Sequence, residues 1–276
     1  MKVSKIVWTQ PTQSGLCDRL SDLFFICALA HIYDAELHLE WPRFEIKDID
    51  APHRSVDILL DNILQYVVFP SKIRFNSDVT QRKENADMIF NAYIGGGKDA
   101  NSFYSAYISN VCSFKQFEDA IQKIKYEFTF CPEILNYADN LPQEFIALHV
   151  RRGDKVRQGN WNDGYFINTH ELEYLDLITK KAIDSYADLG YKHLFVCGDE
   201  DSKNKPFIDY AVSKNFNVFT TPQKEKWIQT YYDIAIMSRA KCVITSQRYS
   251  SFAKFPTLIG NGEFRTVYQI EENRIS

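Results

Sequence analysis

The sequence predicts an α/β protein made of two Rossmann-like domains. One observation is the regular alternation, from Phe145 onward, of short apolar runs of strand length with amphipathic helical patterns, which is typical of a parallel sheet with crossover helices. A second is the order at the start of the chain, where a buried strand, a glycine-containing loop, a helix and another strand follow one another. The 276 residues are enough for two hydrophobic cores. We place the boundary in the Asn140–Gln143 stretch and expect domains over residues 1–141 and 142–276.

The first domain begins with a predicted strand at Ile6–Trp8. A helix follows it, because apolar residues such as Leu16, Leu20 and Phe24 recur at helical spacing until about Asp34. Residues 36–41 alternate between polar and apolar and form a second predicted strand. Beyond it the pattern is weaker and predicts helices at 56–67, around 117–124 and at 132–137, and strands at 72–75 and 87–93.

The second domain has clearer element boundaries. Gly190 stands where a glycine ends a helix, and Pro256 interrupts a helical pattern because proline lacks the backbone N–H. The predicted strands are 145–150, 193–197, 216–219, 242–245 and 266–270, and the predicted helices are 172–186, 227–240 and a short one interrupted near Pro256.

Composition excludes several classes of protein. A hydrophobic content of 45% and a charged content of 25% are ordinary for a globular protein, and a net charge of −4 argues against a dedicated nucleic-acid binder. The six cysteines form no C-x-x-C pair and no zinc spacing, so we expect a reducing compartment. No signal peptide precedes the first strand and no apolar stretch is long enough to span a bilayer, so we expect a soluble, cytoplasmic protein.

Three cations follow the apolar strand at 145–150, namely Arg151, Arg152 and Lys155. Gly153 allows the sharp turn needed at the carboxyl end of such a strand, and that edge is where open α/β sheets bind ligands. Guanidinium groups pair with phosphate oxygens through two parallel hydrogen bonds, so a nucleoside diphosphate is a suitable ligand. The alternative is a structural surface turn in which Arg152 pairs with Asp154.

Two further loops are expected at the same edge. They are Asp199–Asp201 and Thr245–Ser251, and both follow strands that are parallel to the arginine strand if the α/β alternation holds. Arginines for a pyrophosphate, carboxylates for hydroxyl or ring N–H groups, and serines for phosphate or ribose would together form a nucleotide site.

The Asp199–Asp201 stretch also fits the D-x-D pattern of metal-dependent sugar transferases, because hard divalent cations bind carboxylates and bridge phosphates. The alternative is a solvated acidic loop or a helix cap. Since the arginines alone can neutralise a diphosphate, we predict that no metal is needed. His149 lies inside the strand, which favours a core or supporting role over that of a general base.

Three stretches resemble one family. The residues His149–Lys155 resemble the H-x-R-R-x-D motif shared by the α1,2- and α1,6-fucosyltransferases, and Lys155-Val156 is closest to the α1,6 branch, which includes the core N-glycan and Nod-factor enzymes. Ser14–Leu20 is similar to the amino-terminal glycine loop of that family. Asp233–Ser238, followed by Val243–Thr245 and Ser250-Ser251, is similar to its carboxyl-terminal motif.

The resemblance implies a GT-B fold with a cleft between an acceptor-side first domain and a donor-binding second domain. It implies inverting transfer of a sugar, usually L-fucose from GDP-fucose, onto a glycan hydroxyl without a metal. Arg151 would bind the β-phosphate and stabilise the departing GDP, with Arg152 and Asp154 shaping the site. The expected donor-binding residues are Gly15, Leu16, Cys17, His149, Arg151, Arg152, Asp154, Lys155, Asp199, Asp233, Ser250 and Ser251.

One departure from the family concerns the base that would deprotonate the acceptor. In the α1,6 branch a glutamate lies four residues after the lysine of the motif, and here that position is Gly159. Asp18, Asp163 and Asp199 are open candidates for this role.

The chain also lacks the membrane anchor of the Golgi members, so we expect a bacterial enzyme or a viral one in the host cytosol. Three alternatives stay open: another donor such as a xylose nucleotide, a metal-dependent D-x-D transferase, and a non-catalytic nucleotide- or glycan-binding protein.

Overall fold

The structure is a computed structural model that consists of two compact units, Met1–Ile134 and Leu135–Ser276. Each unit contains its own parallel sheet, so the α/β class predicted from the sequence is correct. The residues that the structure describes are 3–9, 15–41, 60–70, 72–76, 86–91, 100–152, 156–157 and 167–275.

The sheet of the first unit is built around its first strand, as in a Rossmann unit. All its pairings are parallel, and the strand order is β4-β2-β1-β5. The four strands are β1 (Lys5–Thr9), β2 (Glu36–Glu40), β4 (Ile73–Asn76) and β5 (Met88–Asn91). The strands predicted at the start of the chain and near residues 72 and 87 are therefore present.

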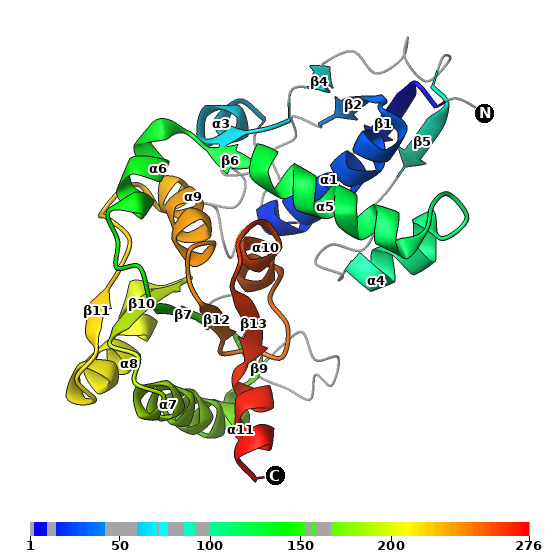
Figure 1. Cartoon of the computed structure of the whole chain (residues 1–276). Coiled ribbons are helices and arrows are strands. Elements are labelled where there is room, and N and C mark those ends of the chain that lie inside the picture. The colour runs from blue at the N-terminus through cyan, green and yellow to red at the C-terminus, as the bar shows by residue number, and fades with distance from the viewer. Residues whose placement is uncertain are drawn as a thin grey trace. The chain divides into compact units, whose positions relative to one another are not determined.

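Helix α1 (Leu16–Tyr33) connects β1 to β2 and lies beside α5 (Phe114–Glu127) (Figure 1). Almost every side chain of α1 is buried, and its Phe25 ring lies 4.9 Å from Phe103 and 6.1 Å from Phe117, measured between ring centroids. The remaining elements of this unit are α3 (Leu60–Tyr66), α4 (Ala100–Phe103), a π-helix (Tyr104–Ile108), and the antiparallel pair β3 (Val67–Val68) and β6 (Thr129–Phe130).

The sheet of the second unit has five parallel strands in the order β11-β10-β7-β12-β13, so β7 is central. Figure 1 shows α7, α8 and α11 on one face of this sheet and α9 and α10 on the other. The strands are β7 (Ile146–Val150), β10 (His193–Gly198), β11 (Asn217–Phe219), β12 (Cys242–Thr245) and β13 (Glu263–Thr266). The helices are α7 (Leu172–Asp188), α8 (Asp201–Ser213), α9 (Lys226–Met237), α10 (Ser251–Ile259) and α11 (Val267–Ile275). A small parallel pair, β8 (Val156–Arg157) and β9 (Ile167–Asn168), and a 3-10 turn (Thr169–Glu171) precede α7.

Strand β7 is buried on both faces, as its apolar sequence predicts. Ile146, Leu148 and Val150 join the hydrophobic core formed with α7, α8 and α11. His149 points to the opposite face, where its ring lies 5.1 Å from the ring of Phe252 on α10. The period of two along the strand thus assigns each following side chain to a face of the sheet.

The last strand of the sequence prediction, 266–270, is wrong. The strand ends at Thr266, and a helix begins at Val267. The backbone N–H of Gln269 donates to Oγ1 of Thr266, and the backbone N–H of Thr266 donates to Oε1 of Gln269. This reciprocal pair is a capping box, a T-x-x-Q signal that starts a helix and outweighs the apolar residues behind it.

Two other helices differ from expectation. Helix α8 fills the chain between β10 and β11, where the sequence pattern predicts no element. Helix α10 continues through Pro256 to Ile259 instead of being interrupted there. Proline removes one backbone donor, and a helix that packs Phe255 fully into the core tolerates that loss.

The division between the units lies inside α6 (Pro132–Asp139), ahead of the stretch considered as a linker. Tyr137 packs edge-on against Tyr232 of α9 with ring centroids 5.6 Å apart. Asp139 accepts a hydrogen bond from Arg239 at 2.7 Å. These contacts make the end of α6 part of the second unit.

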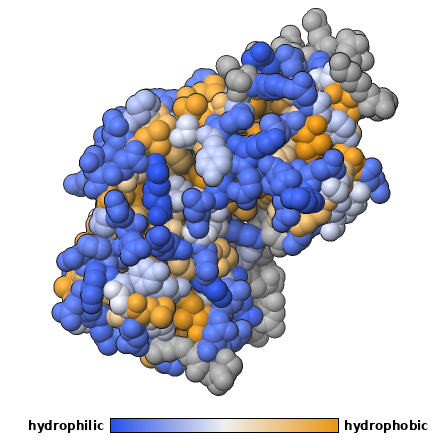
Figure 2. All heavy atoms as spheres, viewed as in Figure 1, coloured by the Kyte–Doolittle hydropathy of each residue, from blue (hydrophilic) through white to orange (hydrophobic). Residues whose placement is uncertain are grey.

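Figure 2 shows a mostly hydrophilic face on which apolar residues form separate patches. Within the described ranges, no helix has both the length and the hydropathy required to cross a bilayer.

Candidate functional site

The carboxyl edge of the second sheet brings three predicted strand-end loops together. The backbone N–H of Arg151, after β7, donates to Oγ of Ser246, after β12, at 3.1 Å. The side chain of Arg151 donates from Nη1 to Oδ1 of Asp199, after β10, at 3.0 Å. The expected convergence is confirmed, because the three strands are parallel neighbours and their ends coincide in register.

Arg151 and Arg152 are neighbours in the chain but bind different partners, Asp199 after β10 and Asp176 on α7. Arg151 pairs with Asp199, and their side chains retain exposed fractions of 15% and 13%. The pair therefore lies at the protein surface but is largely shielded from water. An anion that reaches this edge meets a guanidinium group already oriented by a fixed carboxylate.

Arg152 is buried on the α7/α8 face. It donates to Oγ of Ser246 at 2.8 Å and to Oδ1 of Asp176 on α7 at 2.8 Å. Its guanidinium carbon also lies 5.7 Å from the ring centre of Phe207 on α8. These contacts tie the ends of β7 and β12 to two helices, which is a structural role. Asp154, the partner considered in the sequence analysis, lies outside the described residues.

His149 and Ser250 lie on the α9/α10 face. Burial, helped by the positive charges of Arg151, Lys226 and Arg152 and opposed by Asp199, lowers the pKa of His149 to about 4. The imidazole is therefore neutral near pH 7. Its Nδ1 lies 3.4 Å from Oγ of Ser250, and that oxygen also accepts the backbone N–H of Ala253 as the N-cap of α10.

Ser251 is the first residue of α10 and is half-buried. Together with the cap at Ser250 it places hydroxyl groups at the amino end of a helix, where the backbone N–H groups and the helix dipole favour anions.

Asp233 is a buried carboxylic acid on α9. Burial raises its pKa to about 7, although a hydrogen bond from Thr221 and the charge of Lys226 act in the opposite direction. A carboxyl group that titrates near neutrality is typical of functional sites. The sequence motif found Asp233, but neither Thr221 nor Lys226 was expected.

Lys226 begins α9 and reaches back to the end of β10. Its Nζ donates to the carbonyl oxygen of Gly198 at 2.9 Å and pairs with Oδ1 of Asp201 at 3.3 Å. The only signal in the sequence was a lysine in the first turn of a helix that follows a strand, which is too common to be informative.

Gly198 allows the ends of β10 and β7 to approach closely. A Cβ atom at this position would lie 2.4 Å from the carbonyl oxygen of Val150 and 2.4 Å from Oδ1 of Asn204. Since the oxygen of Val150 is backbone, any side chain here would displace the strand ends that carry Arg151 and Asp199.

The predicted phosphate loop of the first unit begins α1. Gly15 is the exposed N-cap residue, with φ −67° and ψ 167°, while the side chains of Leu16 and Cys17 are buried. At Leu16 and Cys17 it is therefore the backbone that is available to a ligand. Asp18 is half-buried in the first turn, where a carboxylate interacts favourably with the helix dipole.

Several predicted residues cannot be placed. Lys155, Gly159 and Asp163 lie outside the described residues, as does Asp154. Within the described part of the chain, no group of three or more His, Cys, Asp or Glu side chains could hold a metal ion. The two aspartates of the D-x-D stretch both pair with cations, Asp199 with Arg151 and Asp201 with Lys226.

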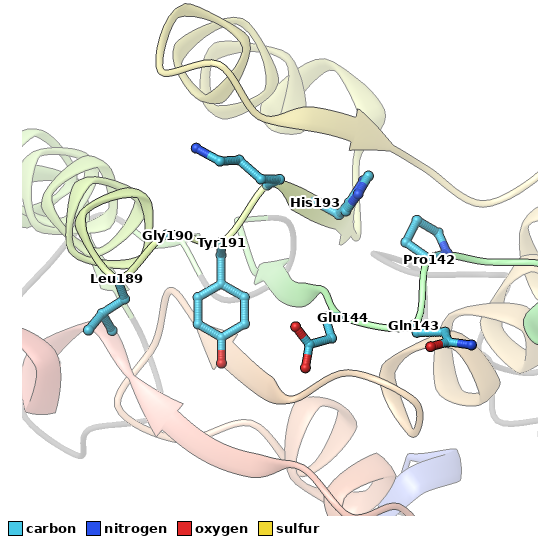
Figure 3. A pocket seen from close by; sticks show the side chains of 8 residues that line it. Pro142, Gln143, Glu144, Leu189, Gly190, Tyr191 and His193 are labelled. Carbon is cyan, nitrogen blue, oxygen red and sulfur yellow. The ribbon is translucent and has the colours of Figure 1, made fainter.

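A pocket of about 560 Å³ lies at the other edge of the same sheet. Figure 3 shows Glu144 and Tyr191 turned to the same side near the starts of β7 and β10. In a parallel sheet the amino and carboxyl ends of the strands lie at opposite edges, so this pocket is remote from Arg151.

No protein-family model matches the chain, and no curated protein matches its sequence. Solved structures do match its fold. The fucosyltransferase NodZ from Bradyrhizobium is 16% identical, with a TM-score of 0.54 over 93% of this chain and 94% of that one. NodZ α1,6-fucosyltransferase soaked with GDP-fucose is 14% identical, with a TM-score of 0.54 over 93% of both chains. POFUT1 in complex with GDP-fucose is 14% identical, with a TM-score of 0.51 over 96% of this chain and 98% of that one. The chain therefore has the two-unit GT-B fold of these fucosyltransferases.

Proposed function

We propose that this protein is an inverting glycosyltransferase that transfers L-fucose from GDP-fucose to a glycan hydroxyl. The observation that carries the proposal is the Arg151–Asp199 pair at the carboxyl edge of the second sheet, beside Ser246. Support comes from the structures with a similar fold, because POFUT1 was solved in complex with GDP-fucose and with GDP, and NodZ was soaked with GDP-fucose. We propose that residues 142–276 bind the donor and that residues 1–141 form the acceptor side.

Arg151 is the proposed catalytic cation. Breaking the bond between the anomeric carbon and the β-phosphate oxygen builds negative charge on the leaving GDP. A guanidinium held by Asp199 stabilises that charge more in the transition state than in the ground state, and it needs no reorganisation at the moment of reaction. Arg152 keeps the two strand ends in place, so it acts by positioning.

Further residues are proposed to bind the donor, most of them near the carboxyl edge of the second sheet. Neutral His149 and buried Asp233 lie on one face of the sheet and are proposed to contact the nucleoside. Ser250 and Ser251, at the start of α10, are proposed to contact phosphate. The backbone of Gly15, Leu16 and Cys17 and the side chains of Asp154 and Lys155 are the remaining proposed donor-binding groups.

The acceptor hydroxyl needs a base as its proton leaves. Asp18 and Asp163 remain the proposed candidates. Asp199 is less suited to this role than the sequence suggested, because its carboxylate is engaged by Arg151.

We propose that the reaction needs no metal. Both carboxylates of the D-x-D stretch are engaged by cations, and guanidinium and ammonium groups already supply the positive charge that a divalent ion would bring. Fucose transfer in the presence of EDTA should match transfer without it. A strong loss of turnover, restored by added Mg²⁺ or Mn²⁺, would favour the metal-dependent transferase.

The cysteines agree with a cytosolic setting. None of the six, all within the described part of the chain, forms a disulfide.

A thermal-shift comparison of GDP with UDP tests the donor, followed by an assay of transfer from GDP-fucose. GDP should raise the melting temperature and UDP should not. Stabilisation by UDP alone would redirect the proposal to another sugar nucleotide, such as a xylose donor. GDP binding without donor hydrolysis or transfer would favour a non-catalytic binding protein.

A further inference from the structure

Lys226 is a second cation at the edge that carries Arg151. Its Nζ donates to the carbonyl oxygen of Gly198 at 2.9 Å, while Arg151 holds the next residue, Asp199, at 3.0 Å. Lys226 at the start of α9 and Arg151 after β7 therefore bind two consecutive residues, Gly198 and Asp199, at the end of β10.

The charge of Lys226 acts on the interior of the candidate site. It lowers the pKa of Asp233, whose pKa burial raises, and it contributes to the low pKa of His149, which burial lowers most. Lys226, the first residue of α9, therefore interacts electrostatically with both groups. Of the charged groups at this edge, Asp201 pairs with Lys226, and Asp233 interacts electrostatically with both.

The two cations differ in their counter-ions. Asp199, the partner of Arg151, is 13% exposed and is fixed by its surroundings. Asp201, the partner of Lys226, is 83% exposed. An exposed ion pair contributes little to stability, so an incoming anion can replace Asp201 at small cost. The largely shielded carboxylate of Asp199 would instead stay in place and orient Arg151.

We propose that Lys226 binds the diphosphate of the sugar nucleotide as a second cation beside Arg151, and that Asp201 is the counter-ion which the diphosphate displaces. This inference rests on the proposed function and adds a residue to its donor site. The ammonium group forms charge-assisted hydrogen bonds with carboxylate and phosphate alike, but a diphosphate carries more negative charge than the single carboxylate of Asp201.

The experiment measures the Kd of GDP and of inorganic pyrophosphate for the full chain by calorimetry. Lys226→Met should raise both Kd values about tenfold, the effect of losing one charge-assisted hydrogen bond, and Lys226→Arg should restore most of the affinity. Asp201→Asn should lower both Kd values about two- to fivefold, because the competing carboxylate is gone. Lys241→Met is the matched control, since Lys241 pairs with Glu144 at 3.8 Å near the opposite edge of the sheet.

Lys226 could instead have a purely structural role and only hold the turn after β10. The opposite effects expected for Lys226→Met and Asp201→Asn distinguish ligand binding from that role. A purely structural role would make Asp201→Asn neutral or harmful, and that result overturns the inference even if Lys226→Met does not fold. Unchanged GDP affinity in Lys226→Met also overturns it and leaves the GDP site standing. If pyrophosphate binds through Lys226 but GDP does not bind, the inference holds and the GDP assignment fails. If the unaltered protein binds neither ligand, both fail.

Discussion

Replacing Arg152 with methionine should destabilise the second unit while replacing Arg151 with methionine should mainly abolish transfer. Both changes remove a guanidinium and keep an apolar stem. Arg152 loses a charge-assisted hydrogen bond to Ser246, worth roughly 1.5–3 kcal/mol. It also loses the pair with Asp176, worth roughly 0.2–1 kcal/mol because Asp176 is 46% exposed. The contact with Phe207 adds roughly 0.5–1 kcal/mol.

The total expected for Arg152→Met is about 2–5 kcal/mol. The lower part of the range is reached if Ser246 remains satisfied, since its hydroxyl also accepts the backbone N–H of Arg151. Arg151→Met removes one partly exposed ion pair and should cost about 1–2 kcal/mol. Its transfer rate should fall by about 100- to 1000-fold, the loss expected for one preorganised donor to the leaving group.

Urea unfolding followed by circular dichroism measures the first quantity, and kcat/KM for transfer from GDP-fucose measures the second. A structural role for Arg152 would be refuted if Arg151→Met lost more stability than Arg152→Met. It would also be refuted if Arg152→Met unfolded within about 0.5 kcal/mol of the unaltered protein, the range of ordinary surface substitutions.

Three further outcomes follow from single contacts. Folding raises the pKa of Asp233 from 3.8 to about 7, so the native protein binds a proton here that the unfolded chain has lost, and the free energy of unfolding falls as the pH rises from about 4 to about 7. Asp233→Asn should lack this fall. If the free energies of unfolding of the two proteins, measured in urea, change in parallel with pH, the prediction is contradicted. Thr266→Ala should lose about 1 kcal/mol of unfolding free energy by removing the cap of α11, while Thr266→Ser keeps the hydroxyl and serves as control. Gly198→Ala should weaken GDP binding and lower the melting temperature, because a Cβ would lie 2.4 Å from the Val150 carbonyl oxygen, and an unchanged protein would show that the strand ends can separate without cost.

The central elements of the second unit were predictable because their signals are local. An apolar run that ends in Arg151 specifies a buried strand and its carboxyl end, and the alternation with helices specifies parallel neighbours. The last strand was misplaced although its signal was also local. Thr266 and Gln269 have the spacing of a capping box, and apolar residues after Thr266 concealed it.

The sequence by itself determined that a strand, a turn and two arginines would stand at the edge where an α/β sheet binds ligands, because burial, helix periodicity and turn residues are properties of neighbouring residues. Only the tertiary structure decided which arginine faces Asp199 and which one braces Asp176, and only it brought Lys226 to Gly198. These facts depend on side chains far apart in the chain that meet through strand order and face. No local pattern encodes such a meeting, because the same residues in another register would point to the opposite face of the sheet.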